Sequence, residues 1–359
     1  MTQAADFDRM SCPAPRNDYE RVLLGHGSGG KLSAELIRRI FLAELGNDVL
    51  SALEDSATLS IGSQDIAAID TRIAFTTDSF VVKPLFFPGG DIGKLAVNGT
   101  VNDLAMAGAR PVYLSAAFIL EEGFEIEQLR RIVVSMREAC AQAGVTLVTG
   151  DTKVVDRGKG DQVFITTTGI GVHRPNCNLS IRNARPGDQV IVSGTIGDHG
   201  ITIMSTREGI EFETALESDT APLNDLTEAM LDACPSIRLM RDPTRGGVSS
   251  TLNELAAASG VGILLDEATI PVRPEVHSAC EMLGLDPMFV ANEGKLIVVV
   301  AEDDAGRLLD VMRSHPLGSD AVAIGKVVED HAGMVVMRSL IGGRRVVTML
   351  AGEQLPRIC

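Results

Sequence analysis

Three aspartates occupy positions that are typical of a site for a metal-bound phosphate group. Asp78 and Asp151 are predicted to stand where strands end, and Asp103 falls on the apolar stripe of a predicted helix. Ligands of α/β sheets bind beyond strand ends, and Mg²⁺ takes carboxylates, water and phosphate oxygens. A buried, unpaired carboxylate costs several kcal/mol, so Asp103 must be paired, metal-bound or protonated. The three residues therefore predict a metal–phosphate site. The alternatives are capping or turn roles for the strand-end acids and a structural salt bridge for the helical one.

Further polar side chains accompany these acids. Lys153 follows Asp151 by two residues, so both side chains lie on one face of an extended strand. A lysine beside a carboxylate can bind phosphate or relay a proton, and a surface ion pair is the simpler interpretation. Lys94, Asn98 and Asn102 recur at four-residue spacing, which places a polar row beside the acid of the predicted helix.

Glycine-rich loops form a second group of candidate phosphate-binding motifs. Residues 25–30 match the pattern G-x-G-x-x-G and lead into a predicted helix, whose first backbone amides would attract an anion. The dinucleotide-binding version also needs a following strand that carries an acid, and residues 46–60 are polar without a convincing strand. We therefore favour a phosphate loop of another kind over a dinucleotide site or a simple turn. Residues 194–200 and 241–247 resemble anion-binding loops, and residues 292–295 add an acid; simple turns are the alternative for all three.

The last residues of the sequence form an unusual tail. Residues 352–359 contain too few apolar side chains for a core element and end in the thiol of Cys359. Eight extended residues reach about 26 Å, so the terminal sulfur is able to travel between its own active site and a partner protein. The alternative is an incidental exposed thiol.

Composition limits the functional classes. The chain has 359 residues, 48 acidic and 32 basic side chains and a formal net charge of −16, which disfavours nucleic-acid binding. The 6 cysteines are scattered without a C-x-x-C pair, which argues against a zinc knuckle or a disulfide framework and favours a reducing compartment. No signal core or membrane-length apolar run is present. We therefore expect a soluble, cytoplasmic protein that binds neither nucleic acid nor membrane.

Helical and extended patterns alternate along the chain and predict an α/β or α+β protein with two cores. Helices are expected after the glycine loop and at residues 91–108, 126–143 and 248–258. Strands are expected at residues 66–69, 73–77, 112–118, 145–148, 162–171, 189–193, 263–266, 295–301, 321–328 and 333–337. The predicted organisation is a flexible arm (residues 1–20), an N-terminal domain (21–181), a C-terminal domain (182–350) and a mobile tail (351–359).

Together the motifs resemble those of the HypE family, the carbamoyl dehydratases of NiFe-hydrogenase maturation. The resemblance extends from Leu24 to Cys359, and the ending Pro-Arg-Ile-Cys is its most specific part. The family belongs to an ATP-binding superfamily that includes aminoimidazole ribonucleotide synthetase and selenophosphate synthetase. Selenophosphate synthetases resemble the chain less, because they carry a reactive cysteine or selenocysteine in the glycine-rich region and this chain has none there.

The resemblance implies a two-domain α/β fold, a homodimer formed through N-terminal domains, and ATP with Mg²⁺ as cofactors. It also implies that Cys359 carries a carbamoyl group, which ATP-dependent dehydration converts to a thiocyanate, the source of the cyanide ligands of the hydrogenase iron. The implied partners are the carbamoyltransferase HypF and the HypC–HypD scaffold complex.

The implied site residues fall into three groups. Activity is expected to depend on Cys359, Asp103, Lys153 and Glu293, and the general base is either Glu293 or Lys153. Metal binding is assigned to Asp78, Asp103 and Asp151, and nucleotide binding to Gly29, Gly30, Lys31, Asp78, Asn98, Asn102, Asp151, Thr152 and Asp242. Two rival hypotheses are an NAD-dependent oxidoreductase that uses the first glycine loop and a non-catalytic scaffold that displays its tail.

Overall fold

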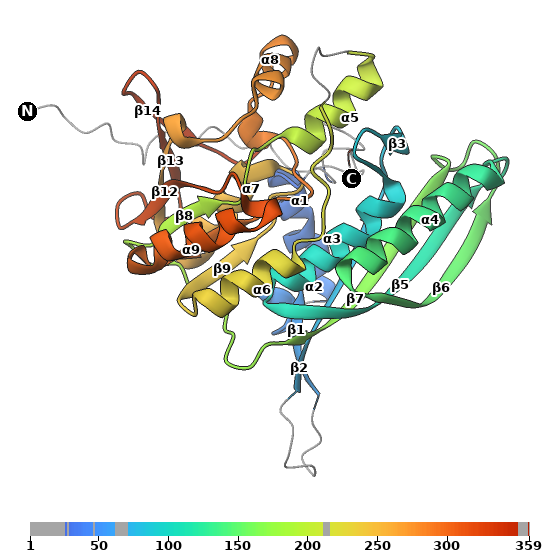
Figure 1. Ribbon diagram of the computed structural model, residues 1–359, viewed down its shortest axis with the longest axis horizontal. Helices are drawn as coiled ribbons and strands as arrows, with labels where there is room; N and C mark the ends of the chain where they lie inside the picture. Colours follow the sequence, from blue (N-terminus) through green and yellow to red (C-terminus); the bar gives the residue numbers. More distant parts are fainter. Residues whose placement is uncertain are drawn as a thin grey trace, which may run out of the picture.

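The computed structural model consists of two mixed β-sheets with helices packed on them (Figure 1). It describes residues 26, 29–45, 47–61, 71–210, 216–350 and 358. The predicted N-terminal arm, the strand expected at residues 66–69 and Cys359 lie outside the described residues. The chain passes from the first sheet to the second between β7 and β8.

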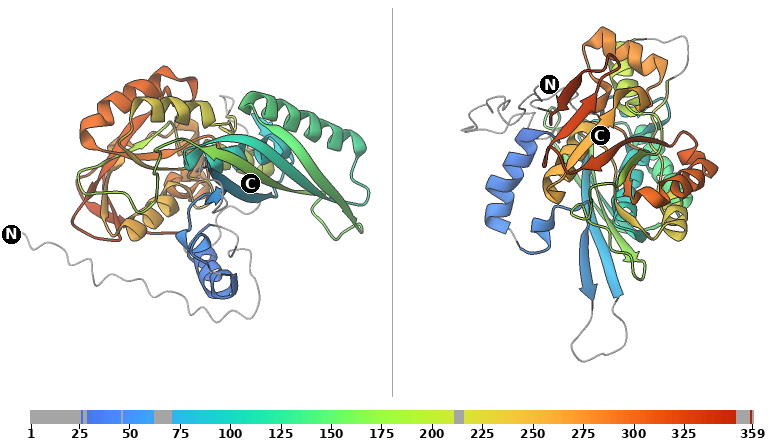
Figure 2. Two further views of the ribbon diagram at one scale, coloured as in Figure 1. Left: turned by 90° about the horizontal axis from the view of Figure 1, so that it is seen from below. Right: turned by 90° about the vertical axis from the view of Figure 1, so that its left-hand side faces the viewer.

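The first sheet has the strand order β1-β2-β7-β5-β6, and its pairs are antiparallel except for β5 with β6. Helices α3 (Ile92–Met106) and α4 (Ile126–Ala143) pack on one of its faces, and their apolar side chains share a core with β2, β5 and β7. Figure 2 shows β5, β6 and α4 projecting away from the second sheet. The strands are β1 (Ala57–Ile61), β2 (Thr71–Phe80), β5 (Ala109–Glu121), β6 (Thr146–Val155) and β7 (Val163–His173), and a small hairpin comprises β3 (Phe86–Phe87) and β4 (Gly90–Asp91).

The second sheet is buried on both faces. Along β11 (Ile297–Val300), Ile297 and Val299 face a core built on α7 (Gly247–Ser259). Val298 and Val300 face a core built on α6 (Asn224–Ala233) and α9 (Glu302–Ser314). This explains the uninterrupted apolar run, which is typical of a strand covered on both sides. The order is β14-β13-β10-β12-β8-β11-β9. The remaining strands are β8 (Gln189–Val192), β9 (Ile237–Arg241), β10 (Gly262–Asp266), β12 (Val322–Val328), β13 (Val335–Arg338) and β14 (Arg344–Val347).

The other helices lie around these sheets or at the surface. Helix α1 (Lys31–Leu36) continues through a π-helical turn (Ile37–Phe41) into α2 (Leu42–Leu45), and none of these residues is buried. The helices of the second half are α5 (Asp198–Glu208), α6 (Asn224–Ala233), α7 (Gly247–Ser259), α8 (Pro274–Leu283) and α9 (Glu302–Ser314). Within the described ranges, no helix combines the length and apolar character that a membrane span requires.

Several predicted elements are confirmed, and the two-core α/β class is among them. Asp91 caps α3, since its Oδ1 accepts hydrogen bonds from the backbone amides of Gly93 at 2.7 Å and Lys94 at 3.0 Å. Helix α4 has the predicted bounds, because its apolar residues follow a regular helical spacing and Gly144 adopts a left-handed conformation at its end.

Two predictions about strands are wrong. No strand was expected at residues 46–60, but β1 (Ala57–Ile61) begins there. Its polar residues are tolerated because β1 is an edge strand of the sheet. It pairs antiparallel with β2, whereas a dinucleotide-binding unit needs parallel strands, so the oxidoreductase hypothesis loses its structural basis. Asp78 and Asp151 lie inside β2 and β6 rather than at strand ends. Gly150 lies within β6 and does not end it. The position requires glycine because an added Cβ would lie 2.3 Å from the Ala116 carbonyl oxygen.

Candidate functional site

Four of the predicted acids gather between α3, β2 and the loops of the second sheet. Asp103 projects from α3 and accepts a hydrogen bond from Thr76 Oγ1 on β2 at 2.6 Å. Asp78 lies two residues further along β2 on the same face. The charges of Asp78 and Asp242 act on both Asp103 and Glu293. Asp242 follows β9 directly, and Glu293 precedes β11.

The cluster holds more negative charge than its surroundings neutralise. Burial raises the pKa of Asp103 well above its usual value, and the charges of Asp78 and Asp242 raise it further. Burial likewise raises the pKa of Asp78, which Arg245 opposes, and raises that of Asp242 to about 6. Four carboxyl groups in one place would repel a triphosphate, so the cluster suits a phosphate that arrives with a cation.

Glu293 has the environment expected of a proton acceptor. Its side chain is 3% exposed, and its Oε1 has no hydrogen-bond partner within the described part of the chain. Burial raises its pKa well above the usual value, and the charges of Asp242, Asp219 and Asp78 add to the shift. A buried carboxylate with a free oxygen and a raised pKa binds a proton more tightly than a solvated carboxylate does.

The loop at residues 292–295 fixes Glu293 through its neighbours. Asn292 donates to the Pro243 carbonyl at 3.0 Å and accepts from the Gly197 amide at 2.8 Å, so it joins three loops. The Glu293 amide donates to Asp219 Oδ1 at 3.0 Å. A Cβ on Gly294 would lie 1.8 Å from the Asp219 carbonyl oxygen, so only glycine allows this approach.

The asparagine row of α3 is placed as predicted, but Asn102 holds protein rather than a ligand. Its Nδ2 donates to the carbonyls of Ala221 at 3.1 Å and Glu293 at 3.2 Å, and its Oδ1 accepts from the Leu223 amide at 2.8 Å. Because it binds the Glu293 carbonyl, Asn102 positions Glu293.

Asn98 donates to Thr220. Its Oδ1 is buried without a partner among the described residues, which leaves this oxygen available to a ligand.

Replacing Asn102 with alanine is expected to lower the free energy of unfolding by about 2–4 kcal/mol, because three buried backbone groups lose their partner. Urea denaturation measures the loss, with Asn47→Ala as the control because Asn47 is exposed. A loss below about 1 kcal/mol for Asn102→Ala would show that the loops are held by other contacts.

The structure does not bring Asp151, Thr152 and Lys153 to this cluster. Asp151 pairs with Ala117 of β5, and the register places its side chain on the sheet face opposite α3, whereas Asp78 faces α3. Lys153 Nζ lies 3.1 Å from Asp151 Oδ2, with side chains 72% and 67% exposed. The shared strand face is confirmed, and within one chain the two residues form a surface ion pair.

The first glycine loop packs tightly against other parts of the protein. Gly29 has a φ of +73°, and a Cβ there would meet the Arg245 carbonyl oxygen at 2.5 Å. Gly30 is similarly crowded by Leu350, whose carbonyl accepts from the Lys31 amide at 3.0 Å. The first glycine loop thus lies against the loop that carries Asp242.

The second predicted anion loop, residues 194–200, is not free to bind an anion. The amides of Ile196, Gly197 and Gly200 donate to Pro271, Asn292 and Ala291, respectively. Its role is structural, because those bonds fix the start of α5.

Ile358, the residue next to Cys359, packs against Val82, which follows the strand that carries Asp78. Ile358 is 5% exposed and forms a β-bridge with Val82. Its carbonyl accepts a hydrogen bond from His199 Nε2 at 2.5 Å. Ile358 also belongs to the same apolar cluster as Ala291, two residues before Glu293.

Sequence reasoning missed the residues that support the cluster. His199 is fully buried, and since the Ile358 carbonyl only accepts, His199 Nε2 carries the proton and Nδ1 accepts from Ser218 at 2.7 Å. Asp219 anchors Glu293 and pairs with Lys295 at 3.3 Å. The one sequence feature that could have indicated these residues is the polar run near 217–225, which has no turn pattern. In the structure this segment is largely buried.

The donor set fits a divalent cation only in company with phosphate oxygens. Among the described residues, no group of three or more His, Cys, Asp or Glu side chains is arranged to hold a metal ion by itself. Arg241 and Arg245 offset only part of the rise in the pKa values of the cluster's carboxyl groups. Mg²⁺ needs few protein ligands when phosphate and water complete its shell.

Comparisons with known proteins agree with this site and fold. Residues 54–173 match the N-terminal domain and residues 185–338 the C-terminal domain of AIR synthase related proteins. A relative from Cupriavidus necator, named carbamoyl dehydratase HypE, is 54% identical over 339 residues, which cover 94% of this chain and 95% of that protein.

Two solved structures are similar throughout. One is that of a HypE–HypF complex, with a TM-score of 0.82 and 50% identity over 88% of this chain and 99% of the matched one. The other is of HypE in complex with ATP, with a TM-score of 0.78 and 48% identity over 94% and 100%. The resemblance seen in the motifs is confirmed, and the chain therefore belongs to the HypE family of carbamoyl dehydratases, built on the AIR synthase-related fold.

Proposed function

We propose that this chain dehydrates a carbamoyl group carried on the sulfur of Cys359 and that the acidic cluster is where the reaction occurs. The γ-phosphoryl group of ATP is transferred to the carbamoyl oxygen, and loss of the nitrogen protons then expels phosphate. Cys359–S–CO–NH₂ and ATP thus become Cys359–S–C≡N, ADP and phosphate. Binding of ATP by a similar HypE supports this choice of substrate.

The docking of Ile358 carries the proposal. The carbonyl of Ile358 is the last backbone acceptor before Cys359, and His199 holds it at 2.5 Å. His199 in turn feels the charge of Asp219, the residue that anchors Glu293. The sulfur is therefore attached to a residue that is held by His199 and Val82, and Val82 follows the strand that carries Asp78.

Glu293 is the general base in this proposal. Its buried, unpartnered Oε1 provides the place for a proton, and its raised pKa makes the carboxylate a stronger base than a solvated one. Lys153, the other candidate, lies on the opposite side of the sheet within the same chain.

Asp78, Asp103 and Asp242 would hold the metal-bound triphosphate. Mg²⁺, when bound, supplies charge that offsets the phosphate oxygens. The three carboxylates orient the nucleotide, Asn98 Oδ1 offers a further acceptor, and the loop containing Gly29, Gly30 and Lys31 packs against the loop that carries Asp242.

A second copy of the chain would complete the site. The sheet face opposite α3 and the edge strand β6 expose apolar side chains that a monomer has no reason to keep in water. A partner that packs there brings its own Asp151, Thr152 and Lys153 to the nucleotide. The exposed residues are Phe75, Tyr113, Ile119, Leu147, Val148, Val154 and Val172.

Mixing two inactive variants tests this arrangement. Lys153→Ala and Glu293→Ala homodimers are expected to be inactive, whereas subunit exchange between equal amounts is expected to restore about a quarter of wild-type turnover. The reason is that half of the dimers then hold one intact site. Absence of recovery, with exchange verified by mass spectrometry, would place Lys153 in its own chain's site.

The proposed partners follow from the chemistry of the tail. HypF, found in complex with a similar HypE, would load the carbamoyl group, and the HypC–HypD complex would receive cyanide from the soft sulfur. The reaction itself is tested by product balance: the loaded chain should release one phosphate for each carbamoyl group lost. Equal phosphate release from the unloaded chain would contradict it.

A further inference from the structure

A separate cavity of about 350 Å³ lies where the chain crosses from the first sheet to the second. It is lined by the segment after β7, the residues before β8, the end of α6 and the start of β9. Arg238 is at this end of β9, whereas Arg241 and Asp242 of the acidic cluster are at the other. The cavity is therefore distinct from the proposed catalytic site.

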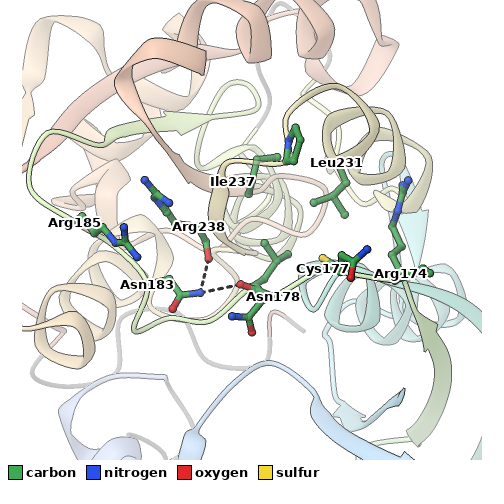
Figure 3. Close-up of a pocket in the computed structure, with 12 residues that line it drawn as sticks. Arg174, Cys177, Asn178, Asn183, Arg185, Leu231, Ile237 and Arg238 are labelled. Carbon is green, nitrogen blue, oxygen red and sulfur yellow. Dashed lines mark hydrogen bonds between the residues drawn. The ribbon is translucent and has the colours of Figure 1, made fainter. Parts of the chain in front are cut away.

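The cavity is positively charged in an acidic protein. Arg174, Arg185 and Arg238 line it, and no acidic side chain does. Figure 3 shows Arg185 and Arg238 side by side at one side of the cavity and Arg174 with Cys177 at the opposite side. Three guanidinium groups around one space favour an anion between them.

The arginines are only partly neutralised. Arg174 pairs with Asp232 and donates to the Glu228 carbonyl. Arg238 Nε lies 3.4 Å from Asp188 Oδ2 but is buried without a well-formed hydrogen bond in the described structure. Arg185 is an exposed side chain at the rim of the cavity, and its guanidinium makes no ion pair with a described residue, so its donors face solvent or a ligand.

The wall between the arginines is held in place before any ligand binds. Asn183 Nδ2 donates to the Asn178 carbonyl at 2.8 Å and to the Arg238 carbonyl at 3.4 Å (Figure 3). Leu231 and Ile237 add an apolar part to the lining between the two sides of the cavity that carry arginines. A ligand with an anionic end and an apolar body would satisfy both surfaces.

We propose that this cavity binds a small organic phosphate, whose phosphate group is held by Arg185 and Arg238 and whose body packs on Leu231 and Ile237. Paired guanidinium groups match the oxygen geometry of phosphate. The volume is that of a small-molecule site.

Phenyl phosphate is the probe, because it carries both features and does not resemble ATP. Calorimetry on the full chain at constant ionic strength is expected to show one saturable site with higher affinity than for inorganic phosphate. Arg185→Gln should weaken binding about tenfold or more. Arg182→Gln is the matched control, since Arg182 is, like Arg185, an exposed arginine of the same connection but does not line the cavity.

Cys177 provides a second readout at the cavity itself. Cys177 is a partly exposed residue that lines the cavity, so bound phenyl phosphate should slow its alkylation by N-ethylmaleimide, located by peptide mass spectrometry. The proposal would be overturned by unchanged affinity in Arg185→Gln, by absence of saturable binding, or by binding that leaves Cys177 unprotected. Equal affinity for inorganic phosphate and phenyl phosphate would overturn the proposal that the body of the ligand packs on Leu231 and Ile237.

Discussion

Glu293→Gln is expected to lower the rate of dehydration about 10²- to 10⁴-fold, the range over which a positioned general base contributes. The substitution keeps the side-chain volume and leaves the backbone bonds to Asn102 and Asp219 intact. It replaces an ionisable group whose charge is costly to bury with a neutral amide, so the variant should unfold at the same urea concentration as wild type or higher.

The measurement is single-turnover conversion of the loaded tail with saturating ATP. Glu121→Gln is the control for the loss of a carboxylate, because Glu121 lies at the far end of β5, where its carboxylate accepts hydrogen bonds from the Gly158 and Gln162 amides. Wild-type turnover in Glu293→Gln would mean that the base is another group and would return Lys153 to consideration.

Cys359→Ala is expected to abolish thiocyanate formation completely while leaving ATP affinity within about twofold of wild type. The sulfur is the point of attachment of the reacting group in the proposed reaction, whereas the carboxylates assigned to ATP lie on α3, β2 and the loop after β9. Cyanide assay and nucleotide titration separate the two effects.

Cys140→Ala is the matched control for that variant, since Cys140 is a buried thiol of α4 away from the cluster. It should retain full dehydration activity. Thiocyanate formation by Cys359→Ala would show that another sulfur carries the carbamoyl group.

The parts of the fold that could be predicted are those determined by local pattern. Helices α3 and α4 carry regular apolar spacing and clear end signals, so their bounds were predictable. The end of β6 was not, because Gly150 has the composition of a turn and only the nearby Ala116 carbonyl explains a glycine within the strand.

The candidate site was predictable in residue type and only partly in arrangement. Asp78, Asp103 and Glu293 do lie together, because each stands beside a strongly patterned element. Within one chain, Lys153 does not lie with these residues. The sheet face that it occupies depends on strand register, which sequence spacing does not reveal. His199 was missed as a site residue because its importance comes from a contact with Ile358, 159 residues away.

The most direct test of the account is the mass of the tail peptide before and after ATP. Cleavage after Glu353 releases residues 354–359 with the modified cysteine. We predict that the carbamoylated peptide is replaced, after ATP addition to the full chain, by one that is lighter by a single water. A carbamoylated peptide that persists while ATP is hydrolysed would contradict the account.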